Sequence, residues 1–186
     1  CLAHNHPSQA ARLLSEMVGA VFAATQNLTF LTHALPRLET EYGFFMSHTT
    51  HGGHAVEFAV NASFTATLNR FVTALGRPRP ESFREDVQTA ASLGLAVSAA
   101  TQLFDDLGAG AETGWDFSSR WFCGNQTQLT QICTSRRIPV DLNAIIVRVE
   151  RNLADWCSLP GATCQRPAAA YAEAADSRSS AREALR

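Results

Sequence analysis

The amino-acid sequence predicts an all-α fold, and two observations support this prediction. Apolar residues recur at spacings of three and four along most of the 186 residues, which is the periodicity of one buried helix face. Loops rich in Gly, Pro and polar residues separate these segments, and only residues 55–64 give a convincing strand-like alternation of apolar and polar side chains. Helices joined by loops, without alternating strands, indicate packed helical layers with one short β excursion.

The N-terminal part is expected to form a helical hairpin over residues 10–46. Residues 10–26 place apolar side chains on one face, and the same spacing resumes over residues 30–45 after a short break. Pro36 lies inside the second pattern. Because proline lacks an amide hydrogen, we expect the helix to start or to kink there.

Two more helices are expected in the middle of the chain, after a breaker-rich loop at residues 76–80. Ser82 stands three residues before Glu85, and this capping-box arrangement predicts a helix start. A further helix is expected over about residues 91–107. The loop that follows is expected to be marked by three glycines, Gly108, Gly110 and Gly114.

The clearest helix begins near Asp141. Its apolar residues fall on one face and are Leu142, Ile145, Ile146, Val149, Leu153 and Trp156. Asp141 is placed to accept hydrogen bonds from the free amides of the first turn. From Pro167 onward the chain is rich in Ala, Glu, Ser and Arg, and we expect an exposed last helix.

The composition is that of a soluble globular protein, with 46% hydrophobic residues, 17% charged residues and a formal net charge of -2. Because there is no basic surplus and no stripe of Lys and Arg, nucleic acid is not an expected partner. No apolar run reaches the roughly 20 residues of a membrane helix, so membrane association is expected only through an anchor outside these residues. The sequence lacks an initiator Met and stops within a helical pattern, so we expect a middle piece of a longer protein, cut at both ends.

The cysteines and glycosylation motifs favour the secretory pathway, with an extracellular or cell-surface location. Three triplets match the N-glycosylation sequon, and they begin at Asn27, Asn61 and Asn125. Four of the five cysteines form two closely spaced pairs, Cys123 with Cys133 and Cys157 with Cys164. Each pair is either a local disulfide or two unconnected thiols.

A histidine cluster is the first candidate for chemistry. His48, His51 and His54 are three residues apart, and histidines on one helical face bind zinc in some proteins. Here they lie in a glycine-containing turn without a nearby cysteine or carboxylate-bearing helix. We therefore expect a solvated turn and no metal.

A second candidate is Asp116, which lies between the large aromatic residues Trp115 and Phe117. An apolar wall disfavours the charged form of a carboxylate and raises its pKa, as a general acid requires. The alternative is a structural aspartate that caps the next turn or pairs with Arg120. These residues alone favour the structural alternative.

The loop Arg79-Pro80-Glu81 is a third candidate. A stiff loop that presents a guanidinium beside a carboxylate suits the binding of sugar hydroxyls or of a charged transition state. The alternative is a loop salt bridge in front of a capped helix. Taken alone, this loop also favours the structural alternative.

Taken together, several segments resemble the trehalase family. The segment Gly114-Trp115-Asp116-Phe117-Ser118-Ser119-Arg120-Trp121 is similar to the family segment that bears the catalytic acid. Further segments match the family in order and spacing: Ala34-Leu35-Pro36, Leu68-Asn69-Arg70, Pro78-Arg79-Pro80-Glu81-Ser82 and Ile138-Pro139-Val140-Asp141-Leu142-Asn143-Ala144. The similarity runs from about residue 8 to the end, and residues 68–150 are its most specific part.

The resemblance implies a fold and an activity. Trehalases are (α/α)₆ toroids that hydrolyse α,α-trehalose to two glucose molecules with inversion, using an Asp as general acid and a distant Glu as general base. Residues 1–186 are thus expected to be part of one trehalase catalytic domain, with the disaccharide trehalose as partner and with no cofactor.

The resemblance also implies roles for individual residues. Asp116 is the catalytic acid. The expected substrate-binding residues are Arg79, Pro80, Glu81 and Gly114, the last through its backbone. Asp141 and Asn143 match a family motif, and we assign them to the support of the helix start.

Some family features are missing from these residues. They include an upstream glycine-rich signature with arginine, a Trp-Asp pair, a later aromatic signature and the segment with the general-base Glu. Pro7-Ser8-Gln9 falls where the family has Arg-Ser-Gln, so a substrate arginine is absent or displaced. We therefore expect the 186 residues alone to be inactive.

Two other functions stay open. One is another helical-toroid α-glucosidase with a different substrate. The other is a non-catalytic or decayed secreted helical protein that binds sugar without cleaving it.

Overall fold

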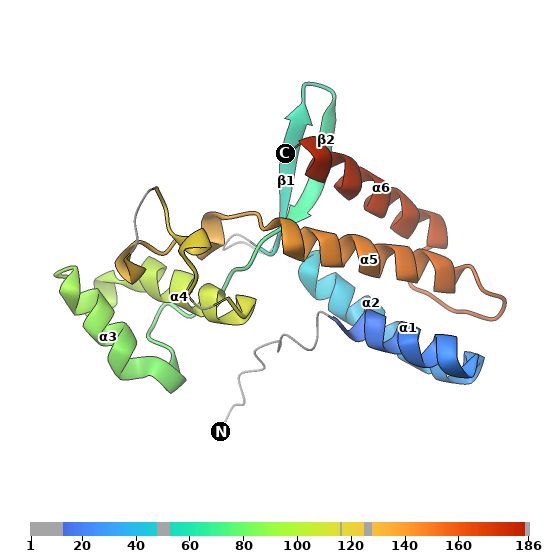
Figure 1. Ribbon diagram of the computed structural model, residues 1–186, viewed down its shortest axis with the longest axis horizontal. Helices are drawn as coiled ribbons and strands as arrows, with labels where there is room; N and C mark the ends of the chain where they lie inside the picture. The colour runs from blue at the N-terminus through green and yellow to red at the C-terminus, as the bar shows by residue number, and fades with distance from the viewer. Residues whose placement is uncertain (1–12, 48–52, 116, 125–127, 185–186) are drawn as a thin grey trace. The chain divides into compact units, whose positions relative to one another are not determined.

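The computed structural model describes residues 13–47, 53–115, 117–124 and 128–184 (Figure 1). The described secondary structure consists of α-helices, short 3₁₀ turns and one two-stranded sheet. This confirms the predicted all-α class with a small β excursion. None of the described helices is long and apolar enough to cross a membrane.

The chain divides into two compact units. The described residues of unit 1 lie within Arg70–Ile138, and those of unit 2 lie within Ala10–Asn69 and Pro139–Arg186. The elements of unit 2 are α1 (Leu14–Thr25), α2 (Leu28–Phe45), β1 (Ala55–Asn61), β2 (Phe64–Asn69), α5 (Val140–Cys157) and α6 (Ala168–Ala184). Helix α5 packs along α6 and also contacts α1 and α2, so it lies at the centre of unit 2 (Figure 1).

Helices α1 and α2 form the predicted hairpin. The Asn27 side chain accepts a hydrogen bond from the Phe30 amide at 3.0 Å and so caps the start of α2. Helix α2 then continues through Pro36, so of the two predicted alternatives, a helix start or a kink at this proline, the start is wrong. Packing of the buried Leu31, Leu35 and Leu38 holds the helix on both sides of the proline.

The β excursion is an antiparallel hairpin, in which β1 pairs with β2 from Ala55↔Asn69 to Asn61↔Phe64. The first strand lies where the sequence predicted it. The second strand extends beyond the predicted range, and its alternation of Phe64, Ala66 and Leu68 is the signal that the prediction missed.

Helix α6 forms where expected, but the prediction that it is exposed is wrong. Tyr171, Ala175, Arg178 and Ala181 are all buried, and they follow one face of the helix. Since alanine and arginine carry little apolar signal, the pattern of the sequence does not reveal this face.

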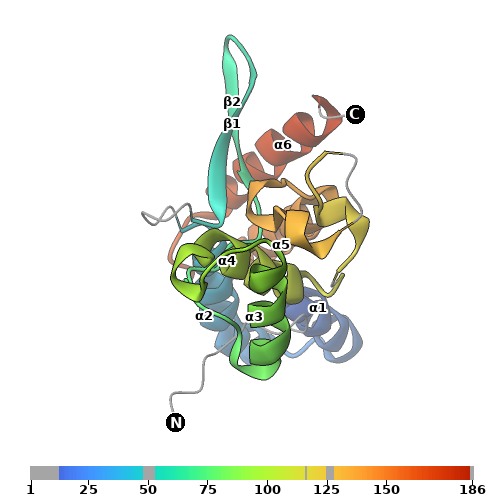
Figure 2. The same cartoon turned by 90° about the vertical axis from the view of Figure 1, so that its left-hand side faces the viewer.

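Unit 1 contains α3 (Phe83–Ser92) and α4 (Thr101–Thr113), which contact each other (Figure 2). Its loops contain 3₁₀ turns at Pro80–Ser82, Val97–Ala99, Ser119–Trp121, Leu129–Gln131 and Thr134–Arg136. Ser82 is at the N-cap of α3 but makes no side-chain cap hydrogen bond, so the predicted capping box is wrong. The 3₁₀ turn leads directly into the helix and takes the place of that cap.

Helix α4 differs most from its prediction. It begins about ten residues later than expected and runs through Gly108 and Gly110, where a loop was expected. A Cβ on Gly108 would lie 2.7 Å from Thr73 Oγ1 and 2.9 Å from Leu75 Cδ1. Glycine is required here for close packing of a helix and not for a turn. Of the three glycines, Gly114 ends the helix, in the left-handed conformation with φ 74°.

The start of α5 uses the two polar residues assigned to it. Pro139 is the N-cap, so the helix begins just before the expected position. The Asp141 carboxylate accepts a hydrogen bond from the Leu142 amide at 3.0 Å, and Asn143 Nδ2 donates to the Pro139 carbonyl at 2.9 Å. The predicted support of the helix start by Asp141 and Asn143 is confirmed.

Both cysteine pairs form disulfides, which decides the alternative that the sequence left open. Cys123 is bonded to Cys133 in unit 1, with a Cα–Cα distance of 5.8 Å. Cys157 is bonded to Cys164 in unit 2, with a Cα–Cα distance of 5.9 Å.

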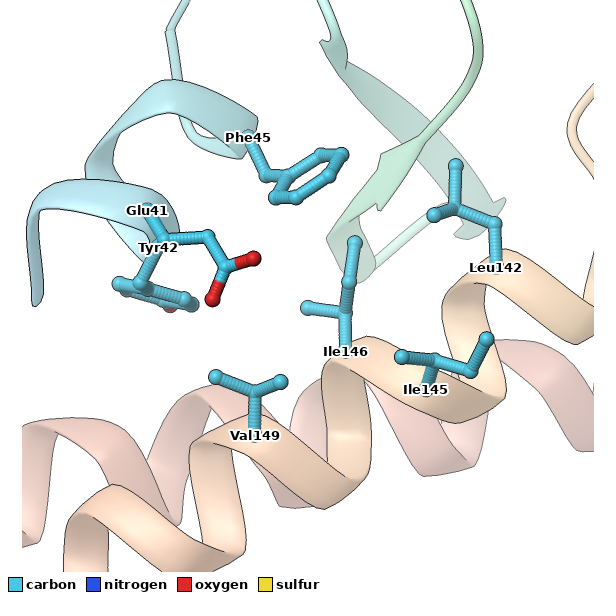
Figure 3. A pocket seen from close by; sticks show the side chains of 7 residues that line it. All are labelled: Glu41, Tyr42, Phe45, Leu142, Ile145, Ile146 and Val149. Carbon is cyan, nitrogen blue, oxygen red and sulfur yellow. The ribbon is translucent and has the colours of Figure 1, made fainter. Parts of the chain in front are cut away.

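A buried carboxyl group lies between α2 and α5 (Figure 3). Both Glu41 oxygens are buried, and neither has a hydrogen-bond partner among the described residues. Glu41 borders a cavity of about 10 Å³, with room for about one water, whose other lining residues are Tyr42, Phe45, Leu142, Ile145, Ile146 and Val149. Burial among these side chains raises the pKa of Glu41 from 4.5 to about 7.

This pKa predicts how stability depends on pH. The pKa of Glu41 is higher in the folded than in the unfolded state. Its contribution to the free energy of unfolding is therefore complete below about pH 4.5 and is lost as the pH rises through about 7. We expect Glu41→Gln to remove this loss, on the order of 1 kcal/mol after discounting for solvent screening. Urea unfolding at about pH 5 and about pH 8 measures the difference. Glu57→Gln on the exposed side of β1 is the control. If the free energy of unfolding depends on pH equally in the wild type and in Glu41→Gln, the prediction is contradicted.

Candidate functional site

The predicted site residues that the structure describes all lie in unit 1. They come from two segments, the loop before α3 and the loop after α4. Asp116, the predicted catalytic acid, lies outside the described residues, but both of its neighbours are described.

Asp86 on α3 fixes the first segment. Its carboxylate accepts hydrogen bonds from the Arg79 backbone amide at 2.9 Å, from Nε at 3.0 Å and from an Nη at 2.7 Å. Both side chains are buried, with exposed fractions of 7% for Arg79 and 2% for Asp86. Arg79 thus forms a buried salt bridge with Asp86 of α3. Two parallel hydrogen bonds hold the guanidinium plane in one orientation.

Pro80 and Glu81 follow Arg79 at the surface. Pro80 begins the 3₁₀ turn, and the Ser82 amide donates to the Arg79 carbonyl at 3.2 Å. Both Pro80 and Glu81 are exposed. The loop therefore combines one buried, fixed cation with a carboxylate that is accessible to solutes.

Phe117 links the two segments. The Arg79 Cζ atom lies 5.2 Å from the centroid of the Phe117 ring, a cation–π distance. On α4, a Cβ on Gly110 would lie 2.9 Å from Phe117 Cε1 and 3.0 Å from Ile132 Cδ1, so only glycine leaves room for the ring. The structure thus brings together two segments that are separate in the sequence, through the residue next to Asp116.

Hydrogen bonds hold the chain on both sides of position 116. The Thr113 hydroxyl donates to the Gly110 carbonyl at 2.7 Å and accepts from the Trp115 amide at 2.9 Å. The Ser118 amide donates to the Trp115 carbonyl at 2.6 Å. Gly114 turns the chain out of α4 and is exposed, so its backbone is accessible.

A second arginine stacks on aromatic rings beside this turn. The Arg120 Cζ atom lies 5.3 Å from the Trp115 ring centroid and 4.8 Å from that of Trp121. Trp121 is buried, whereas Trp115 is 56% exposed. The site therefore presents a large aromatic face to solvent next to a held cation.

The predicted solvated histidine turn is wrong for His54, which is buried and packs with a 4.4 Å ring distance against Phe44. His48 and His51 lie outside the described residues. A cluster of Glu39, Cys157 and Cys164 has metal-ligand residue types, but the disulfide occupies both sulfurs.

Comparison with known proteins identifies relatives of the chain. The family model described as Trehalase matches residues 8–185. A periplasmic trehalase of Xanthomonas oryzae is 40% identical over 141 residues, which cover 75% of this chain and 24% of the relative. A probable trehalase of Oryza sativa is 36% identical over 149 residues, which cover 80% of this chain and 25% of the relative. A trehalase of Pimpla hypochondriaca is 37% identical over 147 residues, which cover 77% of this chain and 24% of the relative. The chain spans about a quarter of the length of these relatives.

Two glycine-to-alanine substitutions are expected to change the stability of the fold in opposite directions. Gly110→Ala forces the new methyl group against the Phe117 ring, and we expect destabilisation of about 1–3 kcal/mol. Gly43→Ala is the matched control, since it lies inside α2 with nothing within 4 Å, and we expect stabilisation of about 0.5–1 kcal/mol. Thermal unfolding measures both effects. A Gly110→Ala variant as stable as Gly43→Ala would show that the ring does not need the glycine.

Proposed function

This chain belongs to the trehalase family, and on that premise we propose that it is part of the catalytic domain of an α,α-trehalase with an (α/α)₆ toroid. The whole protein would hydrolyse trehalose to two glucose molecules with inversion. The observation that best supports this proposal is the contact of Arg79 with Phe117, because it joins the two family segments that carry the candidate residues.

Asp116 is the general acid in this proposal. Inverting glycosidases place an acid and a base roughly 6.5–9.5 Å apart, so that a water fits on the face opposite the leaving group. Asp116 would protonate the oxygen between the two glucose units, and a glutamate outside these residues would activate the water.

Four residues are assigned to substrate binding. Arg79 would orient the substrate by donating hydrogen bonds to sugar hydroxyls. Because Asp86 holds its guanidinium, this orientation exists before substrate binds. The exposed Glu81 would accept hydrogen bonds from hydroxyls, Pro80 would keep the loop stiff, and Gly114 would contact the sugar through its backbone. No cofactor takes part in the proposed reaction.

We also propose that the protein is exported to the extracellular space or the cell surface. Two disulfides form in the structure, and such bonds persist in oxidising compartments. Relatives named as periplasmic trehalases agree with export. Any membrane association would depend on an anchor outside these residues.

Substitution of the proposed acid tests the mechanism. In the whole protein, Asp116→Asn should lower kcat for trehalose by about 10²–10⁴-fold, with an unchanged circular dichroism spectrum. Hydrolysis of α-glucosyl fluoride should fall much less, because fluoride departs without protonation. Near-normal turnover of trehalose, or equal losses with both substrates, would contradict the role of Asp116 as acid.

The 186 residues alone should not hydrolyse trehalose, because the proposed base lies elsewhere. A glucose-release assay on the purified chain checks this expectation, with the whole protein as positive control. Measurable release from the isolated chain would show that the residues present here suffice for catalysis.

A further inference from the structure

A pocket of about 310 Å³ lies within unit 2 and is lined by residues of α2, β2, α6 and the loop before α6. This volume is at the lower end of the range of small-molecule sites. Two arginines, Arg166 and Arg178, belong to the lining, and none of the lining residues is acidic. The charged groups at the surface of the pocket are therefore all cationic, which favours an anionic ligand.

Arg178 is the buried cation of this pocket, with an exposed fraction of 2%. Four of the five N–H donors of its guanidinium have oxygen acceptors. Nε and Nη2 donate to the Glu150 carboxylate at 3.2 Å and 2.9 Å, and Nη1 donates to Asn69 Oδ1 on β2 at 2.7 Å and to Asn143 Oδ1 on α5 at 2.9 Å. The fifth donor, on Nη2, faces the Met46 sulfur at 3.7 Å. Because a thioether is a weak acceptor, an oxygen in the pocket would be a better partner for this donor.

Arg166 is the exposed cation of the pocket. Its Cζ atom lies 6.0 Å from the centroid of the Tyr42 ring and 5.6 Å from that of the Tyr171 ring, so cation–π contacts hold the guanidinium beside both rings. No residue that the structure describes forms an ion pair or a hydrogen bond with this guanidinium, whereas Glu150 balances the charge of Arg178. The charge and the donors of Arg166 are thus available to a ligand.

Two hydroxyl groups add neutral donors to the same lining. Ser177 is on α6 and Thr67 is on β2, and both residues are half-buried. Within the described ranges, neither hydroxyl has a hydrogen-bond partner. Donors from α6, β2 and the loop before α6 therefore face one pocket. A carboxylate offers only two oxygens to such a set, whereas a phosphate group offers at least three.

We propose that this pocket binds a phosphate group, either as inorganic phosphate or as part of a small phosphorylated molecule. One phosphate oxygen would accept from Arg178 Nη2 beside the Met46 sulfur, and the others would accept from Arg166, Ser177 and Thr67. Hydrogen bonds between a guanidinium and a phosphate are roughly twice as strong as neutral ones, so Arg166 contributes most to the affinity. The inference does not depend on the proposed function, because all of these residues belong to unit 2 and the test measures binding.

Titration calorimetry of the whole protein with inorganic phosphate tests the site, at an ionic strength held constant with sodium chloride. We expect a Kd below about 1 mM. Arg166→Gln should raise the Kd by about 10–100-fold, since it removes an exposed charge and leaves the buried network intact. Ser177→Ala should raise it by about 2–10-fold. Arg37→Gln is the matched control, because Arg37 is exposed on α2 and does not line the pocket, and its Kd should equal that of the wild type.

Glycerol 3-phosphate distinguishes the two sources of the phosphate group, with glycerol as its control. Tighter binding of the ester than of inorganic phosphate supports a phosphorylated molecule as the ligand. Equal or weaker binding of the ester supports free phosphate.

Two results overturn the proposal. One is that neither inorganic phosphate nor glycerol 3-phosphate binds with a Kd below about 1 mM. The other is that Arg166→Gln raises the Kd no more than Arg37→Gln does, because phosphate then binds elsewhere on the protein.

Discussion

A buried guanidinium requires a carboxylate and fixed acceptors around it, and each unit has one such arginine among its described residues. In unit 1, the Asp86 carboxylate binds both the backbone and the side chain of Arg79. In unit 2, Glu150 and two asparagine side chains surround Arg178. Because loss of one partner would leave a charge buried without compensation, these residues are held in specific places. The shape of the loop that carries the candidate site and the attachment of α5 to β2 both depend on this constraint.

Close packing fixes the loop that carries the candidate site. The Phe117 ring lies close to Gly110 of α4 and to the Arg79 guanidinium. A larger residue at position 110 would displace the ring, and with it the chain next to Asp116. Preorganisation of this kind is the general source of electrostatic stabilisation in enzymes, because the charged groups do not have to reorient during the reaction.

Apolar periodicity was sufficient to predict the helices with a strongly apolar face, such as α5. It failed where burial depends on distant partners, since the buried face of α6 contains Arg178, whose charge is balanced by Glu150 on another helix. It also failed in α4, because the sequence does not distinguish a glycine that permits close packing from one that permits a turn. The resemblance to trehalases assigned roles to Arg79 and to the segment after α4, but neither the periodicity nor the resemblance gave Asp86 as the partner of Arg79. That pairing depends on how the loop meets α3.

The central claim is that Asp116 donates the proton to the departing sugar, and the position of bound substrate tests it most directly. A crystal structure of the whole protein with a non-hydrolysable trehalose analogue would measure the distance from the Asp116 carboxyl to the bridging atom. We expect a hydrogen-bond distance of about 2.6–3.2 Å, with the Arg79 loop against the same sugar. A carboxyl group directed away from the analogue, with another acid at the bridging atom, would contradict this account.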